Sequence, residues 1–319
     1  MKLGRREISL MIAIAAIALV LAIVAPSYFA AENLRDVFLA NLPLLIVAVG
    51  TTLVILTGQI DISVGSVFAI CSVAAGSFAK LGLPPLLTAI TAGVAGALLG
   101  TMNGALIAYA RVPSVVVTLA SMVALRAALR WYTQGAWIQD LPSSFQWLGL
   151  PQSAYPFFSL ALVAGIIVAT QWALSNLPAG RAIYATGSNE EAARLSGIHT
   201  RLVVLSVFAL NGSLTGVAAI LNSVRFNQIP SNTGLGLEMK VIAAVVIGGA
   251  AITGGAGNMI GTILGVTLLG AIGPALTFLG VSAYWERALQ GGIILAAVII
   301  DAIRARAKRQ GAGFAGVRT

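Results

Sequence analysis

The sequence is poor in charge and in the residues that carry most protein chemistry. Charged residues make up 9% of its 319 residues, with 19 basic and 10 acidic side chains, one histidine and one cysteine. An ordinary soluble domain has about 25% charged residues, so this chain cannot cover a water-exposed surface. This excludes a soluble enzyme, a nucleic-acid-binding domain and a disordered chain. Because Cys71 is the sole thiol, an intrachain disulfide and a thiol-based metal site are excluded as well.

Apolar residues and glycine are abundant instead. Hydrophobic residues make up 58% of the chain and glycine adds 35 residues, while the mean hydropathy is +0.95. Since a bilayer crossing takes about 20 residues, the composition is sufficient for about ten crossings. We therefore predict a polytopic membrane protein with one transmembrane domain over residues 1–319.

The apolar runs are continuous and do not alternate, which favours helices over strands. The third and eighth runs are short, so we expect their ends to be broken or re-entrant. The predicted spans are 8–25, 36–57, 62–78, 85–108, 113–129, 157–177, 202–222, 239–252, 259–279 and 285–300.

The distribution of basic residues predicts the orientation. The first apolar run is too long for a signal peptide and no clear cleavage site follows, so we interpret it as a retained span. With an even number of spans both termini lie on one side, and Lys and Arg favour the cytoplasm. Twelve of the 19 basic residues fall on that side: Lys2, Arg5, Arg6, Arg111, Arg181, Arg194, Arg201, Arg304, Arg306, Lys308, Arg309 and Arg318. Both termini are therefore predicted to be cytoplasmic.

Glycine is placed in stripes and in two breaks. Stripes at four-residue spacing in 96–104, 212–216 and 257–265 favour close helix packing, with helix sliding during transport as the alternative. Glycine-rich breaks occupy 57–63 and 248–258. They are expected at matching places in two five-span halves, and the odd number of spans in each half predicts an inverted repeat.

Polar side chains in or near the spans are few. Asp61 is expected near the inner interface, capping the third span, with a solute or ion contact as the alternative. Amides can donate and accept hydrogen bonds without a net charge, which suits a neutral hydroxylated solute. Interhelical hydrogen bonding explains each amide equally well. The candidates for the solute pathway are Gln59, Asp61, Asn103, Asn211, Asn222 and Gln228.

The longest polar stretch on the predicted inner side is residues 178–201. Ser188 or Asn189 can cap a short helix whose first turn holds Glu190 and Glu191, and Gly197 can end it. A solvated connector is the alternative interpretation.

This stretch resembles a known loop. Glu191-Ala192-Ala193 followed by Gly197 resembles the EAA-x3-G loop of ABC importer permeases. Residues 53–66 (LVILTGQIDISVGS), 180–198 and 236–265 are similar to segments of ribose-type sugar permeases, of the branched-chain amino acid/ribose permease family. Residues 135–142 (GAWIQDLP) and 229–240 (IPSNTGLGLEMK) look most like the autoinducer-2 and rhamnose branch. Gln59 stands where many sugar permeases have Ser-Gly.

The resemblance implies a helical permease in a bacterial inner membrane that imports autoinducer-2, rhamnose or ribose, in that order of similarity. It implies a separate ABC ATPase that carries ATP and Mg, a second permease copy or paralogue, and a periplasmic or lipid-anchored solute-binding protein. No lysine precedes Ser or Thr, so this chain has no Walker A loop. The implied coupling helix comprises Asn189, Glu190, Glu191, Ala192, Ala193, Arg194 and Gly197.

Two other classes remain as alternatives. An ion-coupled secondary transporter of a small neutral solute would need ionisable residues inside the membrane. Apart from Asp61 and the boundary residues Arg126 and Arg130, the spans are nearly free of charge. An intramembrane enzyme would need a histidine site or an aspartate pair, but the single histidine, His199, lies beside the inner loop.

Overall fold

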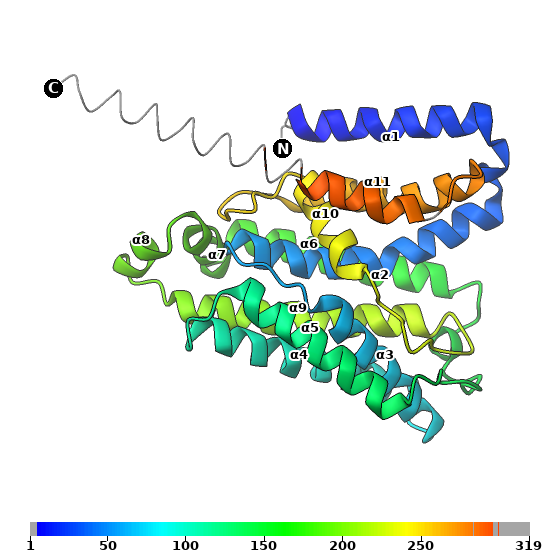
Figure 1. The fold of residues 1–319 in the computed structure, drawn as a ribbon, viewed down its shortest axis with the longest axis horizontal. Coiled ribbons are helices and arrows are strands. Elements are labelled where there is room, and N and C mark those ends of the chain that lie inside the picture. The colour runs from blue at the N-terminus through cyan, green and yellow to red at the C-terminus, as the bar shows by residue number, and fades with distance from the viewer. Residues whose placement is uncertain (1–4, 283, 296–298, 300–319) are drawn as a thin grey trace.

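The computed structural model describes residues 5–282, 284–295 and 299, and this part of the chain is all-α (Figure 1). The helices are α1 (Arg5–Val24), η1 (Pro26–Phe29), α2 (Ala31–Leu56), α3 (Val64–Lys80), α4 (Pro85–Ala108), α5 (Ser114–Thr133), η2 (Gln146–Gly149), α6 (Tyr155–Asn176), α7 (Pro178–Ser188), α8 (Glu190–Leu195), α9 (Thr200–Ser223), α10 (Leu237–Ile247) and α11 (Met259–Phe278).

Seven of the described helices are long and apolar enough to cross a membrane: α1, α2, α4, α5, α6, α9 and α11. They coincide with seven of the predicted spans. The two spans expected to be short are indeed short, with 17 residues in α3 and 11 in α10. The tenth predicted span, 285–300, lies partly outside the described residues; residues 284–295 are helical.

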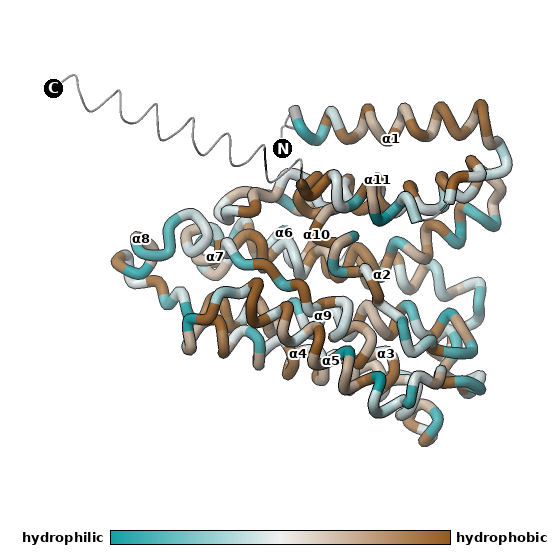
Figure 2. Tube along the Cα trace, viewed as in Figure 1, coloured by the Kyte–Doolittle hydropathy of each residue, from teal (hydrophilic) through white to brown (hydrophobic). Residues whose placement is uncertain are grey.

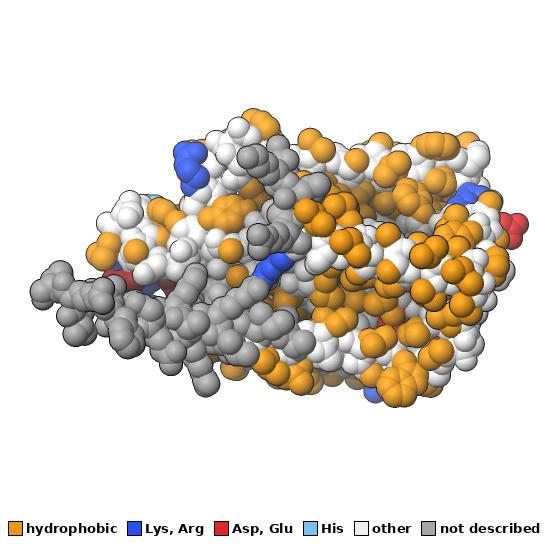
Figure 3. Space-filling view, turned by 90° about the horizontal axis from the view of Figure 1, so that it is seen from above, with side chains coloured by type: hydrophobic (Ala, Val, Ile, Leu, Met, Phe, Trp, Pro, Cys, Tyr) orange, Lys and Arg blue, Asp and Glu red, His pale blue; other side chains and the backbone are white. Residues whose placement is uncertain are grey.

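The long helices run side by side around a centre formed by α2 and α9, while α7 and α8 project from one end, called here the α8 end (Figure 1). In the most apolar window of α2, 83% of residues are buried, against 11% in α1 and 17% in α6. The outer helices therefore leave apolar side chains uncovered, as a lipid-facing surface requires. Figures 2 and 3 show this distribution: hydrophilic residues gather at α8 and in the turns at the opposite end, and apolar side chains dominate the face seen from above.

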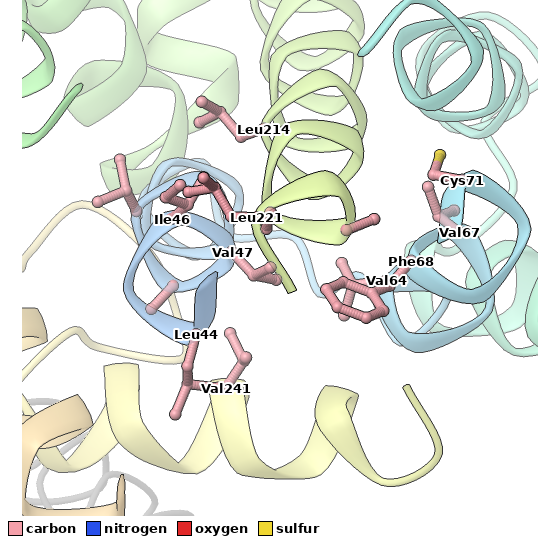
Figure 4. Close-up of a cluster of buried hydrophobic side chains, with 14 of the residues drawn as sticks. Leu44, Ile46, Val47, Val64, Val67, Phe68, Cys71, Leu214, Leu221 and Val241 are labelled. Carbon is pink, nitrogen blue, oxygen red and sulfur yellow. The ribbon is translucent and has the colours of Figure 1, made fainter. Parts of the chain in front are cut away.

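The core joins the central helices to the two short ones. Buried side chains of α2, including Val47, meet Leu221 of α9, Phe68 of α3 and Val241 of α10 (Figure 4). Cys71 is buried within α3 in the same cluster. The short helices are thus held by apolar packing on the central pair.

The glycine stripes produce close helix contacts. The contact between α4 and α9 is the most extensive in the described part of the chain. A Cβ on Gly96 would overlap the carbonyl oxygen of Gly212, and one on Gly100 would overlap that of Phe208. On the other side of the bundle, a Cβ on Gly261 would overlap the carbonyl oxygen of Gly248. The packing interpretation of the stripes is confirmed.

The expected relation between the two glycine-rich breaks is wrong. Segments 57–63 and 248–258 lie together at the α8 end, where the N–H of Gly255 donates to the carbonyl oxygen of Leu56 at 2.9 Å. Equivalent breaks of an inverted repeat would lie at opposite ends of the bundle. The segment that enters a short helix from the other end is 224–236, which precedes α10.

Candidate functional site

The short helix predicted in the polar loop forms as α8, and a second helix that was not predicted, α7, precedes it and meets it at Asn189. The side chain of Asn189 accepts the N–H of Ala192 at 2.9 Å, so Asn189 and not Ser188 caps α8. Gly197 adopts φ 84° and ends the helix, with its N–H donating to the carbonyl oxygen of Arg194 at 3.0 Å. This left-handed geometry favours glycine because it has no Cβ.

Most of α8 faces outward from the bundle. Glu191 and Arg194 form an exposed ion pair at 2.6 Å, and Leu195 is 77% exposed beside them. The pair lowers the pKa of Glu191 below its ordinary value, first through the Arg194 hydrogen bond. Ala193 instead points inward and is buried, and Thr200 donates to Glu190 at 3.3 Å. The helix therefore has an anchored inner side and an uncovered outer side of mixed charge.

The connection from α8 into the bundle runs through α7. The hydroxyl of Tyr184 donates to the carbonyl oxygen of Gly257 at 2.9 Å. A Cβ on Gly187 would overlap the carbonyl oxygen of Leu56 and come within 2.7 Å of the nitrogen of Gly255. Segment 248–258 also receives the N-terminal helix, because Arg6 donates to the carbonyl oxygen of Gly249 at 3.2 Å. Helix α7 therefore contacts both breaks.

A polar hollow of about 550 Å³ separates α8 from the ends of α4, α5 and α9. Gln59 contributes to its lining from the break 57–63, so this candidate lies at the α8 end and not among the other amides. The charged residues in the lining are Arg111, Glu190, Glu191, Arg194 and Arg201.

Three of the other candidates form one buried hydrogen-bond network. The carboxylate of Asp61 accepts from Asn211 at 2.9 Å, from the N–H of Ser63 at 2.9 Å and from the hydroxyl of Ser63 at 2.6 Å. Asn103 donates to the hydroxyl of Ser63 at 2.9 Å, and Ser121 donates to Asn103 at 2.5 Å. The network joins the first break to α4, α5 and α9 and is closed to solvent, since Asp61 is 2% exposed and both amides 0%.

The expected position of Asp61 near the inner interface is wrong. Asn211 is at the middle of the 24-residue helix α9, about 17 Å from either end at 1.5 Å per residue. Asp61 accepts the N–H of Ser63, the residue before α3, and it also bonds across the bundle to Asn211. The sequence missed this because the pairing spans 150 residues of chain.

The remaining pathway candidates lie apart from the network. Asn222 lines a hollow of about 670 Å³ beside Lys240 and Glu286, which form an ion pair at 2.8 Å. Gln228 lies in segment 224–236, where its neighbour Ile229 exchanges two backbone hydrogen bonds with Ile138.

One buried acid was not singled out from the sequence. Glu238, the second residue of α10, is 8% exposed, and its Oε2 has no hydrogen-bond partner. The sequence feature that could have identified it is an acidic residue in the first turn of a largely apolar helix, close to Lys240. Among the described residues, no cluster of His, Cys, Asp or Glu could hold a metal ion.

The bundle of long apolar helices, its two segments that enter short helices, and the exposed helix α8 define a membrane-embedded transport subunit. The chain belongs to the family described as the permease component of the branched-chain amino acid transport system, whose model matches residues 33–298. This family membership confirms the resemblance seen in the sequence.

Named relatives cover nearly the whole chain. It is 35% identical over 300 residues to the autoinducer 2 import system permease protein LsrC of Photorhabdus laumondii, spanning 93% of this chain and 90% of that protein. The protein of the same name in Yersinia pseudotuberculosis is 35% identical (93% and 85%), and that of Escherichia coli is 34% identical over 302 residues (93% and 87%). No solved structure matches the chain. The chain is therefore the permease component of an ABC-type importer, and the ATPase is a separate protein.

Proposed function

We propose that this permease imports autoinducer-2 or a small sugar of the rhamnose or ribose class, driven by ATP hydrolysis in a partner. The observation that carries the proposal is similarity over 93% of the chain to permeases named for autoinducer 2 import. Such a solute is hydroxyl-rich, so polar groups that donate and accept without many charges suit it.

In this proposal α8 is the coupling helix within residues 178–201, and the ATPase docks on its outer side. The exposed Glu191, Arg194 and Leu195 supply a surface of mixed character. The contacts of Tyr184 and Gly187 supply the route by which ATPase closure moves both breaks. ATP and Mg are bound by the partner.

The proposed orientation places the α8 end in the cytoplasm, together with both termini. Arg111 and Arg201 line the hollow at that end, and Arg181 lies in α7, in agreement with the preference of basic residues for the cytoplasm. The aromatic side chains of Tyr132 and Trp137 are exposed towards the opposite end, as in an interfacial belt. The basic residues of 304–318 lie outside the described ranges.

The proposed architecture is ten spans in an inverted repeat, with α2 equivalent to α9 and α4 equivalent to α11. Residues 96–104 read GALLGTMNG and residues 257–265 read GNMIGTILG, which share the pattern GxxxGTxxG. A pseudo-two-fold axis requires each helix of one half to pack on the equivalent of its partner in the other half. This is seen in two pairs: α4 packs on α9, and α11 packs on α2. Segments 57–63 and 224–236 then enter their short helices from opposite ends.

The complete importer in this proposal contains the ATPase, a second copy or paralogue of this permease, and a periplasmic or lipid-anchored solute-binding protein. A pull-down of tagged chain from mild detergent tests this composition. We expect an ATPase to be retained by the wild type and lost when the α8 surface is reversed by Glu191→Lys and Arg194→Glu. Equal retention by that double variant, at equal membrane abundance, would contradict docking on α8.

An ion-coupled secondary transporter is the alternative drawn from the sequence, and the family to which the chain belongs sets it aside. It predicts uptake of solute by proteoliposomes holding this chain alone under a proton or sodium gradient. Uptake that needs ATP and the partner ATPase, with no response to either gradient, would exclude it.

A further inference from the structure

Each segment that enters a short helix brings a buried carboxylate with it, and the two carboxylates differ in one respect. Asp61 of segment 57–63 accepts hydrogen bonds on both oxygens, from Ser63 and Asn211. Glu238, which follows segment 224–236, is 8% exposed, yet its Oε2 accepts no hydrogen bond. A buried acceptor without a partner is costly, about 1–3 kcal/mol or more for a charged group. Asp61 is satisfied by the fold, whereas Glu238 keeps one buried oxygen, lying against Gly65, that no group of the described residues satisfies.

The position of Glu238 is set by the start of α3. A Cβ on Gly65 would overlap Oε2 of Glu238, so glycine at this position makes room for the carboxylate. The neighbouring Ser66 donates to the carbonyl oxygen of Met122 at 2.9 Å, which fixes α5 at the same level. The carboxylate thus lies where α3, α5 and α10 meet in the interior of the bundle.

A hollow of about 570 Å³ opens between α5 and α10 at this point, and Glu238 is part of its lining. Its volume is within the range of small-molecule sites, about 300–1,000 Å³. Arg126 and Arg130 are four residues apart and line one face of α5, and Gln134 lies just after the end of the helix. Arg126 is held in place by a hydrogen bond of 2.8 Å to the carbonyl oxygen of Thr233. The ring of Trp131 lines the same hollow towards its outer end.

We infer that this hollow is a solute-binding site of the permease for one small polyhydroxylated molecule. Glu238 accepts hydrogen bonds from solute hydroxyls, and the guanidinium groups of Arg126 and Arg130 donate to solute oxygens. The indole of Trp131 packs against the apolar face of the solute. The inference rests on the proposed import function and adds to it a location that shares no residue with the sequence-derived pathway candidates.

The first test measures uptake by proteoliposomes holding the complete complex, with D-ribose, L-rhamnose and autoinducer-2 as separate probes. Glu238→Gln and Arg126→Gln are each expected to lower uptake about tenfold or more, since each removes a charged hydrogen-bonding partner. Glu32→Gln, which removes an exposed carboxylate of α2 at the same end, is the matched control and is expected to transport normally. Wild-type uptake in ATP combined with normal uptake by both pocket variants would overturn the site and leave the import function standing.

The second test does not depend on ATP or on folding at wild-type yield. The single native thiol, Cys71, is buried, so a cysteine placed at Ala127 in the hollow can be labelled selectively with a water-soluble thiol reagent. Ala124→Cys, on the exposed side of α5 outside the hollow, is the control. We expect one of the three probes to slow labelling of Ala127→Cys at least fivefold and to leave Ala124→Cys unchanged.

Protection at Ala127→Cys without ATP-driven uptake would support the site while contradicting the importer. Labelling unaffected by any of the three probes would overturn the site. Ribose 5-phosphate is added as a fourth compound, and protection by it alone would also overturn the site, because it would indicate an anion site on the two arginines.

Discussion

At the scale of single residues, the polar groups inside this permease divide into those satisfied by the fold and those that are not. Asp61 and Asn103 belong to the first group, because Asn103 donates to Ser63, Ser63 donates to Asp61, and Ser121 donates to Asn103. Asn211 donates to Asp61, but its own Oδ1 has no partner. Such a network fixes the first break in place, and its cost is low only while every member keeps its partners.

Replacing Asn211 by alanine tests this structural role. The change removes the donor to Asp61 and opens a void between α9 and α2, so we expect a loss of about 1–3 kcal/mol or more of stability. Thermal unfolding in detergent measures it. Asn176→Ala is the control, because Asn176 is exposed and bonds only its own helix; an equal change in the two variants would contradict the network.

The exposed ion pair of α8 defines the pH range over which docking of the ATPase should stay constant. Because Arg194 lowers the pKa of Glu191, the contribution of the pair is present above the unfolded pKa of about 4.3 and is lost as the pH falls through the lower folded value. Retention of the ATPase on the α8 surface should therefore be unchanged from about pH 8 to pH 5.5. A loss of retention between those limits, with the ATPase itself intact, would show that another group controls docking.

At the scale of elements, folding of the bundle depends on the close contact of α4 with α9 at their glycines. A leucine at Gly212 would meet the backbone of Gly96 and Gly100, so Gly212→Leu should prevent accumulation of folded protein. A Cβ at Gly165 of α6 meets nothing within 4 Å, so Gly165→Leu should be tolerated. Fluorescence-detected gel filtration of the two variants checks this, and a monodisperse Gly212→Leu protein would contradict the packing.

The link from α7 to the second break predicts a different phenotype. Tyr184→Phe keeps the ring and removes the hydrogen bond to Gly257, so the ATPase should still bind while uptake falls about two- to tenfold. Tyr109→Phe, at an exposed ring, is the control. Uptake and ATP hydrolysis that stay coupled as in the wild type would contradict this route.

The elements also show what sequence reasoning could achieve. Long apolar runs such as those of α2 and α9 were predicted because helix formation in lipid is local, and the cap and end of α8 followed from residues within a few positions of each other. The meeting of 57–63 with 248–258, and of Asp61 with Asn211, depends on contacts between distant segments, which no local pattern contains. Glu238 was not predicted because a single acidic residue can be assigned to a site only once the hollow that it lines is known.

At the scale of the whole molecule, the family and the fold agree on a permease that depends on a separate energy source. The α8 end holds the proposed coupling surface, the polar hollow and both glycine-rich breaks, whereas the inferred solute site opens towards the other end. A cycle in which ATPase closure at one end alters solute access at the other needs this separation of the two functions along the bundle.

The most direct test of the account is solute uptake by proteoliposomes that contain the purified complex, measured with ATP, without ATP, and with a proton or sodium gradient in place of ATP. We predict uptake of autoinducer-2 or a small sugar only when ATP and the partner ATPase are both present. Uptake by this chain alone, driven by an ion gradient, would contradict the central claim.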